Sequence, residues 1–191
     1  MQATAVTRGT YECRNLLSPQ PPQVLNYIPI IINFVSMNCT SLLIHIVFAT
    51  KGRENTLILQ NRSDLHAYMA ATCKNLKCQP LAINGTADHV HVFIDMWPSV
   101  SVSEFVKTIK LSSGDFIKKS HKFWDFRGWQ EGYFAGSVGP DGKNRCISYI
   151  NNQGIHHLGR GFLAEMEWLN MKYQIETDLK NGVQPLSGLE G

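Results

Sequence analysis

The sequence is poor in charged residues and has no long hydrophobic run. Charged side chains make up 17% of the 191 residues and apolar ones 43%, so the chain is globular rather than disordered. The apolar run at residues 28–35 is far shorter than the ~20 residues of a membrane span. We therefore expect a soluble protein with no membrane partner. Its net charge of +3 permits a nucleic-acid partner without requiring one.

The cysteines give no disulfide framework. There are five, an odd number, and they are scattered along the chain. The one close pair, Cys73 and Cys78, lacks the spacing of a zinc knuckle or a redox motif. A reducing compartment suits such a chain, so we expect the protein to be cytoplasmic.

The first 36 residues differ from the rest, with few charges, no sustained periodicity and a group of prolines. We expect residues 1–36 to be an extension upstream of a true start at Met37, or else a poorly ordered tail. Residues 37–180 would then form the functional domain. Residues 181–191, which hold glycine, proline and serine, are expected to be a flexible tail.

Strand and helix signals alternate over the functional domain. Short apolar, β-branched runs predict strands at residues 42–49, 80–84 and 88–96, and a fourth ending near 138. Helices are predicted from Ser63 or Asp64 to 77, from Ser101 onward, and over residues 143–154 and 162–175. This order predicts an α+β, ferredoxin-like split βαβ sandwich. Its four-stranded antiparallel sheet would carry two helices on one face, with additional C-terminal helices. Such a fold does not determine the function by itself.

Two histidines stand at alternate positions of the third predicted strand. Because successive side chains of a strand point to opposite faces, His89 and His91 share one face. The pair could be the polar face of a half-buried strand, or it could bind a metal ion or a phosphate. Spacing alone favours the first interpretation.

Three lysines of the helix that starts at Ser101 fall within one narrow arc. They are Lys107, Lys110 and Lys118. A lysine stripe is usually a solvated helix face, but it is also where a nucleic-acid backbone could lie. We treat the three as candidate DNA contacts.

A tyrosine and a glutamine are further candidate site residues beside the histidine pair. Tyr149 and Gln153 are four residues apart in the helix predicted over residues 143–154, so they would project from the same face. A phenol oxygen can form a covalent phosphotyrosine once activated. Two imidazoles and an amide oxygen form a mixed nitrogen and oxygen site suited to Mg²⁺ or Mn²⁺.

These residues resemble a known family. The His89-Val90-His91 strand, the Trp-Gln-Glu-Gly-Tyr run at 129–133, and the Tyr-Ile-Asn-Asn-Gln run at 149–153 followed by His156 and His157 are similar to the single-tyrosine HUH transposases of the insertion-sequence 200/605 type. Residues 44–53 are similar to the way those proteins begin. The resemblance covers about residues 37–175.

The resemblance implies a specific chemistry. Tyr149 would be the nucleophile, and His89, His91 and Gln153 would bind the metal ion. The protein would cleave single-stranded DNA at hairpin-containing element ends through a 5′-phosphotyrosine and rejoin strands without ATP or any nucleotide cofactor. It would act as a homodimer, in which the tyrosine helix of one subunit serves the histidine pair of the other.

Two alternatives remain. One is a non-catalytic module that binds single-stranded nucleic acid on a ferredoxin-like fold. Such modules stack bases on aromatic residues of the sheet, whereas this strand presents histidines. The other is a replication initiator or relaxase with the same tyrosine chemistry, which the short chain disfavours.

Overall fold

The computed structural model describes residues 39–153 and 161–175. The predicted extension at 1–36 and the tail at 181–191 lie outside these residues, as do His156 and His157. The chain divides into two compact units, Met1–Cys39 and Thr40–Gly191. Everything that follows concerns the second unit.

An antiparallel four-stranded sheet in the order β2-β3-β1-β4 forms the centre of this unit. The strands are β1 (Leu43–Ala49), β2 (Gln79–Gly85), β3 (His89–Asp95) and β4 (Phe134–Ser137). β1 and β3 lie in the middle because their β-branched and aromatic residues suit strands buried on both faces. The short connection between β2 and β3 forms the expected hairpin.

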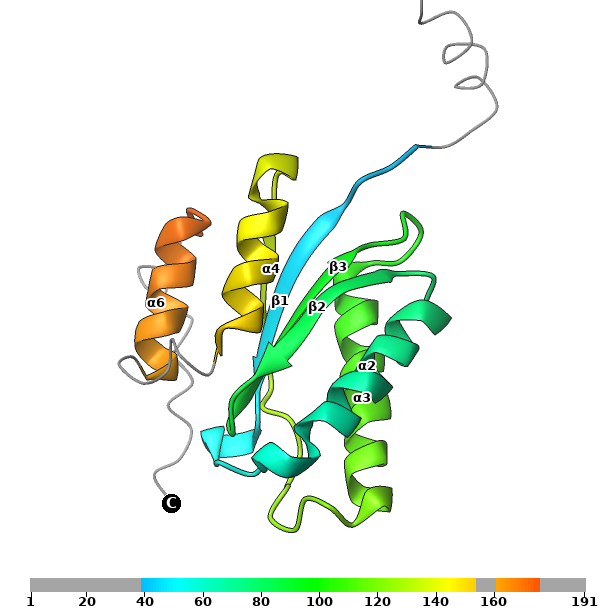
Figure 1. Ribbon diagram of the computed structural model, residues 1–191, viewed down its shortest axis with the longest axis vertical. Helices are drawn as coiled ribbons and strands as arrows, with labels where there is room; N and C mark the ends of the chain where they lie inside the picture. The colour runs from blue at the N-terminus through cyan, green and yellow to red at the C-terminus, as the bar shows by residue number, and fades with distance from the viewer. Residues whose placement is uncertain (1–38, 154–160, 176–191) are drawn as a thin grey trace, which may run out of the picture. The chain divides into compact units, whose positions relative to one another are not determined.

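Helices cover both faces of the sheet (Figure 1). On one face lie α2 (Leu59–Asn75) and α3 (Val102–Ser120), and on the other α4 (Lys143–Asn151) and α6 (Phe162–Lys172). Two 3-10 turns, η2 (Lys51–Arg53) and η3 (Pro140–Gly142), join elements. The α+β, ferredoxin-like fold expected from the sequence is confirmed. None of the helices in the described part of the chain is long and apolar enough to span a bilayer.

Strand alternation sorts the residues of β3 between the two layers. Val90, Val92 and Ile94 are fully buried against α2 and α3. Phe93 packs instead in a cluster with α4 residues. His89 and His91 share the face of Phe93, so both imidazoles lie under α4 and α6.

Helix α2 begins earlier than predicted. We expected Ser63 or Asp64 to cap it, but both lie inside a helix that starts at Leu59. Its N-cap, Ile58, makes no side-chain capping hydrogen bond. The preceding Leu57 is fully buried, so packing rather than a cap determines where this helix starts. At α3 the predicted cap is confirmed, because Ser101 Oγ accepts a hydrogen bond from the Glu104 N–H at 3.2 Å.

Helix α4 is shorter than predicted. It ends at Asn151, so Tyr149 and Gln153 do not lie on one continuous helical face. The Asn84 side chain explains the end, because its Nδ2 donates to the carbonyls of Ile150 at 3.0 Å and Asn151 at 3.1 Å. This contact also holds the end of α4 against β2.

The tryptophan-led run supports the core. Trp129 forms an isolated β-bridge with Thr50, and its ring packs edge-on against Phe48 at 4.8 Å and Phe126 at 5.1 Å. Its Nε1–H donates to Ser113 Oγ at 3.0 Å, so the buried polar atom of the indole has a partner. This part of the motif is structural.

Candidate active site

Three buried side chains meet between β3 and α6. Glu165 Oε2 lies 3.2 Å from His89 Nε2, and Glu165 Oε1 lies 3.4 Å from His91 Nε2. His89 and His91 are each 0% exposed and Glu165 is 5% exposed. Their candidate ligand atoms all lie within 4.8 Å of one another. Two imidazoles and one carboxylate in a water-poor site fit a divalent metal ion.

The other ring nitrogen of His89 is held by polar neighbours. His89 Nδ1 lies 2.8 Å from Asp88 Oδ1 and 2.8 Å from Thr86 Oγ1. Burial opposes protonation of His89, but the hydrogen bonds to Asp88 and Glu165 outweigh it and raise the pKa of the ring. A carboxylate on Nδ1 directs Nε2 into the site, a common arrangement for metal-binding histidines.

Glu165 carries the negative charge of the cluster. Burial alone would raise the pKa of its carboxyl, but hydrogen bonds from His89 and His91 outweigh burial and hold the pKa well below its usual range. Glu165 is therefore a carboxylate, the form that binds a divalent cation.

Tyr149 reaches the same point from α4. Its hydroxyl donates a hydrogen bond to Glu165 Oε1. Its ring centroid lies 5.8 Å from that of His91 and 5.3 Å from that of Trp168. Burial and the Glu165 carboxylate raise the pKa of the Tyr149 hydroxyl above its ordinary value. The phenol is thus protonated and oriented by the residue that faces both histidines.

Gln153 joins the cluster through the carboxylate. It is fully buried, and its Nε2 donates to Glu165 Oε1 at 3.0 Å. Its Oε1 has no hydrogen-bond partner within the described part of the chain. Gln153 therefore lies at the predicted site, and its role as a metal ligand stays a prediction.

Sequence reasoning missed Glu165. It is sixteen residues from Tyr149 and on a different helix, so no local motif joins them. One signal was present: Phe162, Glu165 and Leu169 are three and four residues apart, which places a carboxylate within the apolar stripe of α6. A charged residue in such a stripe is seldom buried without a partner.

A further histidine lies on this face. His45 of β1 is 1% exposed, and its ring stacks on His91 with centroids 5.2 Å apart. Burial, followed by the proximity of His91, holds the pKa of His45 well below its ordinary value. His45 is therefore a neutral ring.

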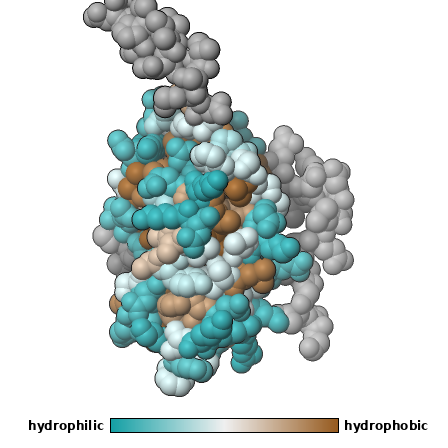
Figure 2. All heavy atoms as spheres, turned by 90° about the vertical axis from the view of Figure 1, so that its right-hand side faces the viewer, coloured by the Kyte–Doolittle hydropathy of each residue, from teal (hydrophilic) through white to brown (hydrophobic). Residues whose placement is uncertain are grey.

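The candidate DNA-contact lysines lie on the opposite side of the sheet. Lys107 and Lys118 are exposed on α3. Lys110 is half-buried, and its Nζ donates to the carbonyls of Gln130 at 2.8 Å and Gly132 at 2.5 Å. The face formed by α2 and α3 is largely hydrophilic, with small separate hydrophobic patches (Figure 2). Lys110 thus fixes a loop, whereas the other two ammonium groups face solvent.

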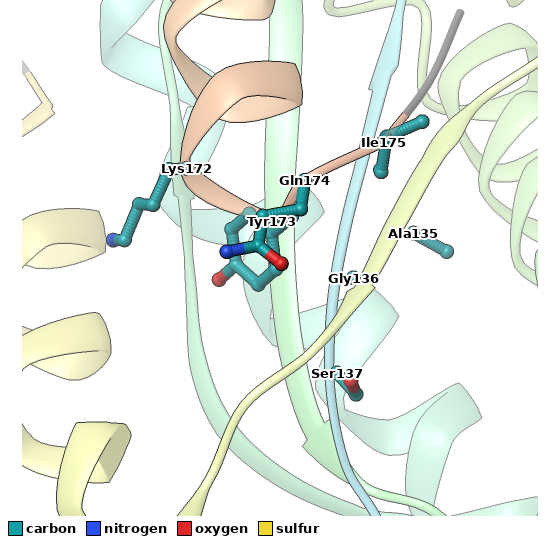
Figure 3. Close-up of a pocket in the computed structure, with 7 residues that line it drawn as sticks. All are labelled: Ala135, Gly136, Ser137, Lys172, Tyr173, Gln174 and Ile175. Carbon is teal, nitrogen blue, oxygen red and sulfur yellow. The ribbon is translucent and has the colours of Figure 1, made fainter.

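A pocket of about 400 Å³ lies beside the cluster, between β4 and the end of α6. Figure 3 shows its lining, in which Tyr173 stands alongside Gly136. Neither histidine of β3 lines it, nor does Glu165. The pocket and the candidate metal site are therefore separate features, and Tyr173 lies between them.

Comparison with known proteins identifies related chains. Residues 38–153 match the family model described as "Transposase IS200 like". The chain is 28% identical over 114 residues to the transposase for insertion sequence element IS200 of Salmonella typhimurium and, equally, of Salmonella typhi. Each alignment covers 57% of this chain and 74% of the relative.

Two solved structures are also similar. A putative transposase from Deinococcus radiodurans R1 has 23% identity and a TM-score of 0.49, with 61% of this chain and 93% of that chain covered. A REP-associated tyrosine transposase bound to a REP hairpin has 12% identity and a TM-score of 0.49, with 63% and 71% covered.

Proposed function

Because the chain belongs to the IS200-like transposase family, we propose that it cleaves and rejoins single-stranded DNA with Tyr149 as the nucleophile. The substrate is single-stranded DNA at the ends of the element, including hairpins, and the active form is a homodimer. The observation that carries this proposal is the convergence of the Tyr149 hydroxyl with His89, His91 and Glu165 at one buried point.

The proposed cleavage exchanges one phosphoester bond for another. The Tyr149 oxygen attacks the scissile phosphorus and loses its proton, and the bond from phosphorus to the 3′-oxygen breaks. The 3′-oxygen takes up a proton and leaves as a free hydroxyl, while the 5′-phosphate stays on the tyrosine. Attack by a 3′-hydroxyl reverses the exchange, so rejoining needs no ATP.

Residues around Tyr149 prepare the attack. The hydrogen bond to Glu165 fixes the direction of the phenol O–H within the cluster. Contact with Trp168 and burial limit the rotation of the ring. Preorganisation of this kind lowers the entropic part of the barrier.

His89, His91 and Glu165 would hold the divalent ion, with Gln153 as a further candidate ligand. When bound, such an ion polarises the scissile phosphate and offsets the negative charge that develops on it. Asp88 and Thr86 hold the His89 ring by its Nδ1, so that Nε2 would be the atom that binds the ion.

Covalent trapping tests the proposal. We expect the purified chain to form a protein–DNA adduct with single-stranded hairpin oligonucleotides when Mg²⁺ or Mn²⁺ is present, because the phosphotyrosine survives denaturation. Chelation with EDTA should abolish the adduct. Adduct formation is read on a denaturing gel with end-labelled DNA. Binding to the same oligonucleotides without nicking in any divalent metal would contradict the proposal and favour a binding module.

The exposed lysines of α3 are proposed to contact the DNA backbone. We expect the Lys107→Ala/Lys118→Ala double variant to bind all oligonucleotides more weakly, because phosphate contacts carry no sequence information. The slope of log K against log salt should fall by about one for each of the two lysines that binds a phosphate. Fluorescence anisotropy at several salt concentrations measures both effects, with Lys74→Ala, an exposed lysine of α2, as the control. An unchanged slope would remove these lysines from the interface.

A further inference from the structure

We propose that His45 is a positioning residue, which with Tyr173 fixes the ring orientation and the proton position of His91 so that His91 Nε2 offers its lone pair to the metal ion. This inference rests on the proposed function in one respect, namely that His91 is a metal ligand. The inference goes beyond the proposed function because it gives a role to His45 and Tyr173, which are not proposed as metal ligands.

The contacts form a continuous chain across the sheet. His45 Nε2 lies 3.0 Å from His91 Nδ1, and His45 Nδ1 lies 3.3 Å from the Tyr173 hydroxyl. His91 Nε2, at the other end, faces Glu165 at 3.4 Å. Every imidazole nitrogen along this path therefore has a polar neighbour. His45 and His91 are 1% and 0% exposed, so water contributes little to these contacts.

Once His91 is a metal ligand, the hydrogen-bond geometry determines the positions of the protons. A metal ligand must present a lone pair on Nε2, so His91 carries its proton on Nδ1. That proton is donated to His45 Nε2, which must then be the acceptor. His45 therefore carries its own proton on Nδ1 and donates it to the Tyr173 oxygen. Only this arrangement satisfies both hydrogen bonds and keeps hydrogen off His91 Nε2.

The two ligand histidines are thus oriented by different partners. His89 Nδ1 contacts the carboxylate of Asp88, whereas His91 Nδ1 contacts the neutral ring of His45. A neutral partner adds no charge next to Glu165, the carboxylate that binds both rings. His45 supplies orientation without a second buried anion, which would be costly in this interior.

The Tyr173 ring packs tightly against strand β4. Gly136 pairs with His45 in the register of β1 and β4. A Cβ on Gly136 would overlap the Tyr173 ring at Cδ1, so only glycine lets the ring lie against the strand (Figure 3). The small residue of β4 therefore admits the ring whose hydroxyl reaches His45.

Tyr173 also connects this path to α4. Its hydroxyl interacts with the thiol of Cys146, and burial together with that contact raises the pKa of Tyr173. Cys146 is three residues before Tyr149, on the helix that carries the nucleophile. The path from His91 through His45 and Tyr173 thus ends on the helix of the attacking group.

Metal affinity and the tautomer of His91 test the inference in the full chain. We expect His45→Ala to weaken Mn²⁺ binding about 10–100-fold, the range seen when an outer partner of a metal ligand is removed. His45→Gln should keep most of the affinity, because its Oε1 can accept the His91 Nδ1 proton in place of the ring nitrogen. Isothermal titration calorimetry measures both. His66→Ala is the matched control, since His66 is a half-buried histidine of α2, on the opposite face.

The tautomer is read with saturating Mg²⁺, which is diamagnetic, by long-range ¹H–¹⁵N correlation of the histidine rings at mildly alkaline pH. We expect His91 and His45 in the wild-type protein to carry the proton on Nδ1. A predominant Nε2–H form of His91, or equal Mn²⁺ affinity of His45→Ala and wild type, would overturn the inference. Failure of the wild type to bind Mn²⁺ would contradict the metal part of the proposed function, whereas wild-type binding with no loss of affinity in His45→Ala would contradict only the inference. If His45→Ala does not fold, the Mn²⁺ affinity of His45→Gln and the wild-type tautomer still test the role of His45.

Discussion

Tyr149→Phe is expected to abolish covalent attachment of DNA, lowering adduct formation by roughly 10⁴-fold or more, the scale on which loss of a nucleophile acts in other covalent catalysts. Only one oxygen is removed. The ring keeps its contacts with Trp168 and His91, so the helix and its packing remain. The Glu165 carboxylate keeps its partners His89, His91 and Gln153. DNA binding and Mn²⁺ affinity should therefore stay close to wild type, which separates loss of chemistry from loss of structure.

The matched control is Tyr133→Phe. Tyr133 is 45% exposed and immediately precedes β4, so loss of its hydroxyl should leave adduct formation unchanged. Adducts of normal yield from Tyr149→Phe would remove Tyr149 from the nucleophile role. Peptide mapping of the wild-type adduct gives the same answer independently, since the nucleotide should be found on the peptide that contains Tyr149.

Mixing two inactive variants locates the active site within the proposed homodimer. Tyr149 contacts the Glu165 and His91 of its own chain. If this arrangement is the active one, Tyr149→Phe mixed with His91→Ala should stay inactive, because no chain then holds a complete site. The resemblance implies the opposite arrangement, in which the tyrosine helix serves the other subunit. Recovery of activity in the mixture would show that arrangement.

The sequence predicted the strands of this fold better than its helix ends. Alternation of His89, Val90 and His91 was enough to place both imidazoles on one face, because strand periodicity depends only on local geometry. The ends of α2 and α4 were wrong because they depend on distant contacts. Buried Leu57 determines one end, and the Asn84 side chain bonds the carbonyls at the other.

The residues of the candidate site also differ in whether a local pattern predicted them. Tyr149 and the histidine pair were found because each belongs to a short pattern whose chemistry can be recognised. Glu165 and Tyr173 were not, because they reach the cluster from another helix and their roles depend on how α6 packs against the sheet. Gly136 is the other half of the Tyr173 contact, and a glycine in a strand does not indicate which distant ring packs against it.

Glu165→Ala is expected to cost more metal affinity than Gln153→Ala, although only Gln153 was predicted from the sequence. The carboxylate is the one anion of the described cluster that faces both candidate ligand imidazoles, and both of its oxygens face the cluster. Its loss would remove a proposed ligand and the charge that would balance a bound dication. We expect Mn²⁺ affinity to fall by more than the ~100-fold that loss of an outer partner costs at most.

Gln153 contributes a neutral amide that reaches the cluster through Glu165 Oε1. For Gln153→Ala we therefore expect a loss of about tenfold, within the range for partners that orient a ligand. Glu165→Gln separates charge from shape, since it keeps the size of the side chain and removes the anion. It should resemble Glu165→Ala in calorimetry with Mn²⁺, while unfolding stays cooperative. Because Glu165 also accepts the hydrogen bond of the Tyr149 hydroxyl, adduct formation should fall in both Glu165 variants even at saturating metal. If Gln153→Ala lost more affinity than Glu165→Ala, the amide and not the carboxylate would be the third ligand.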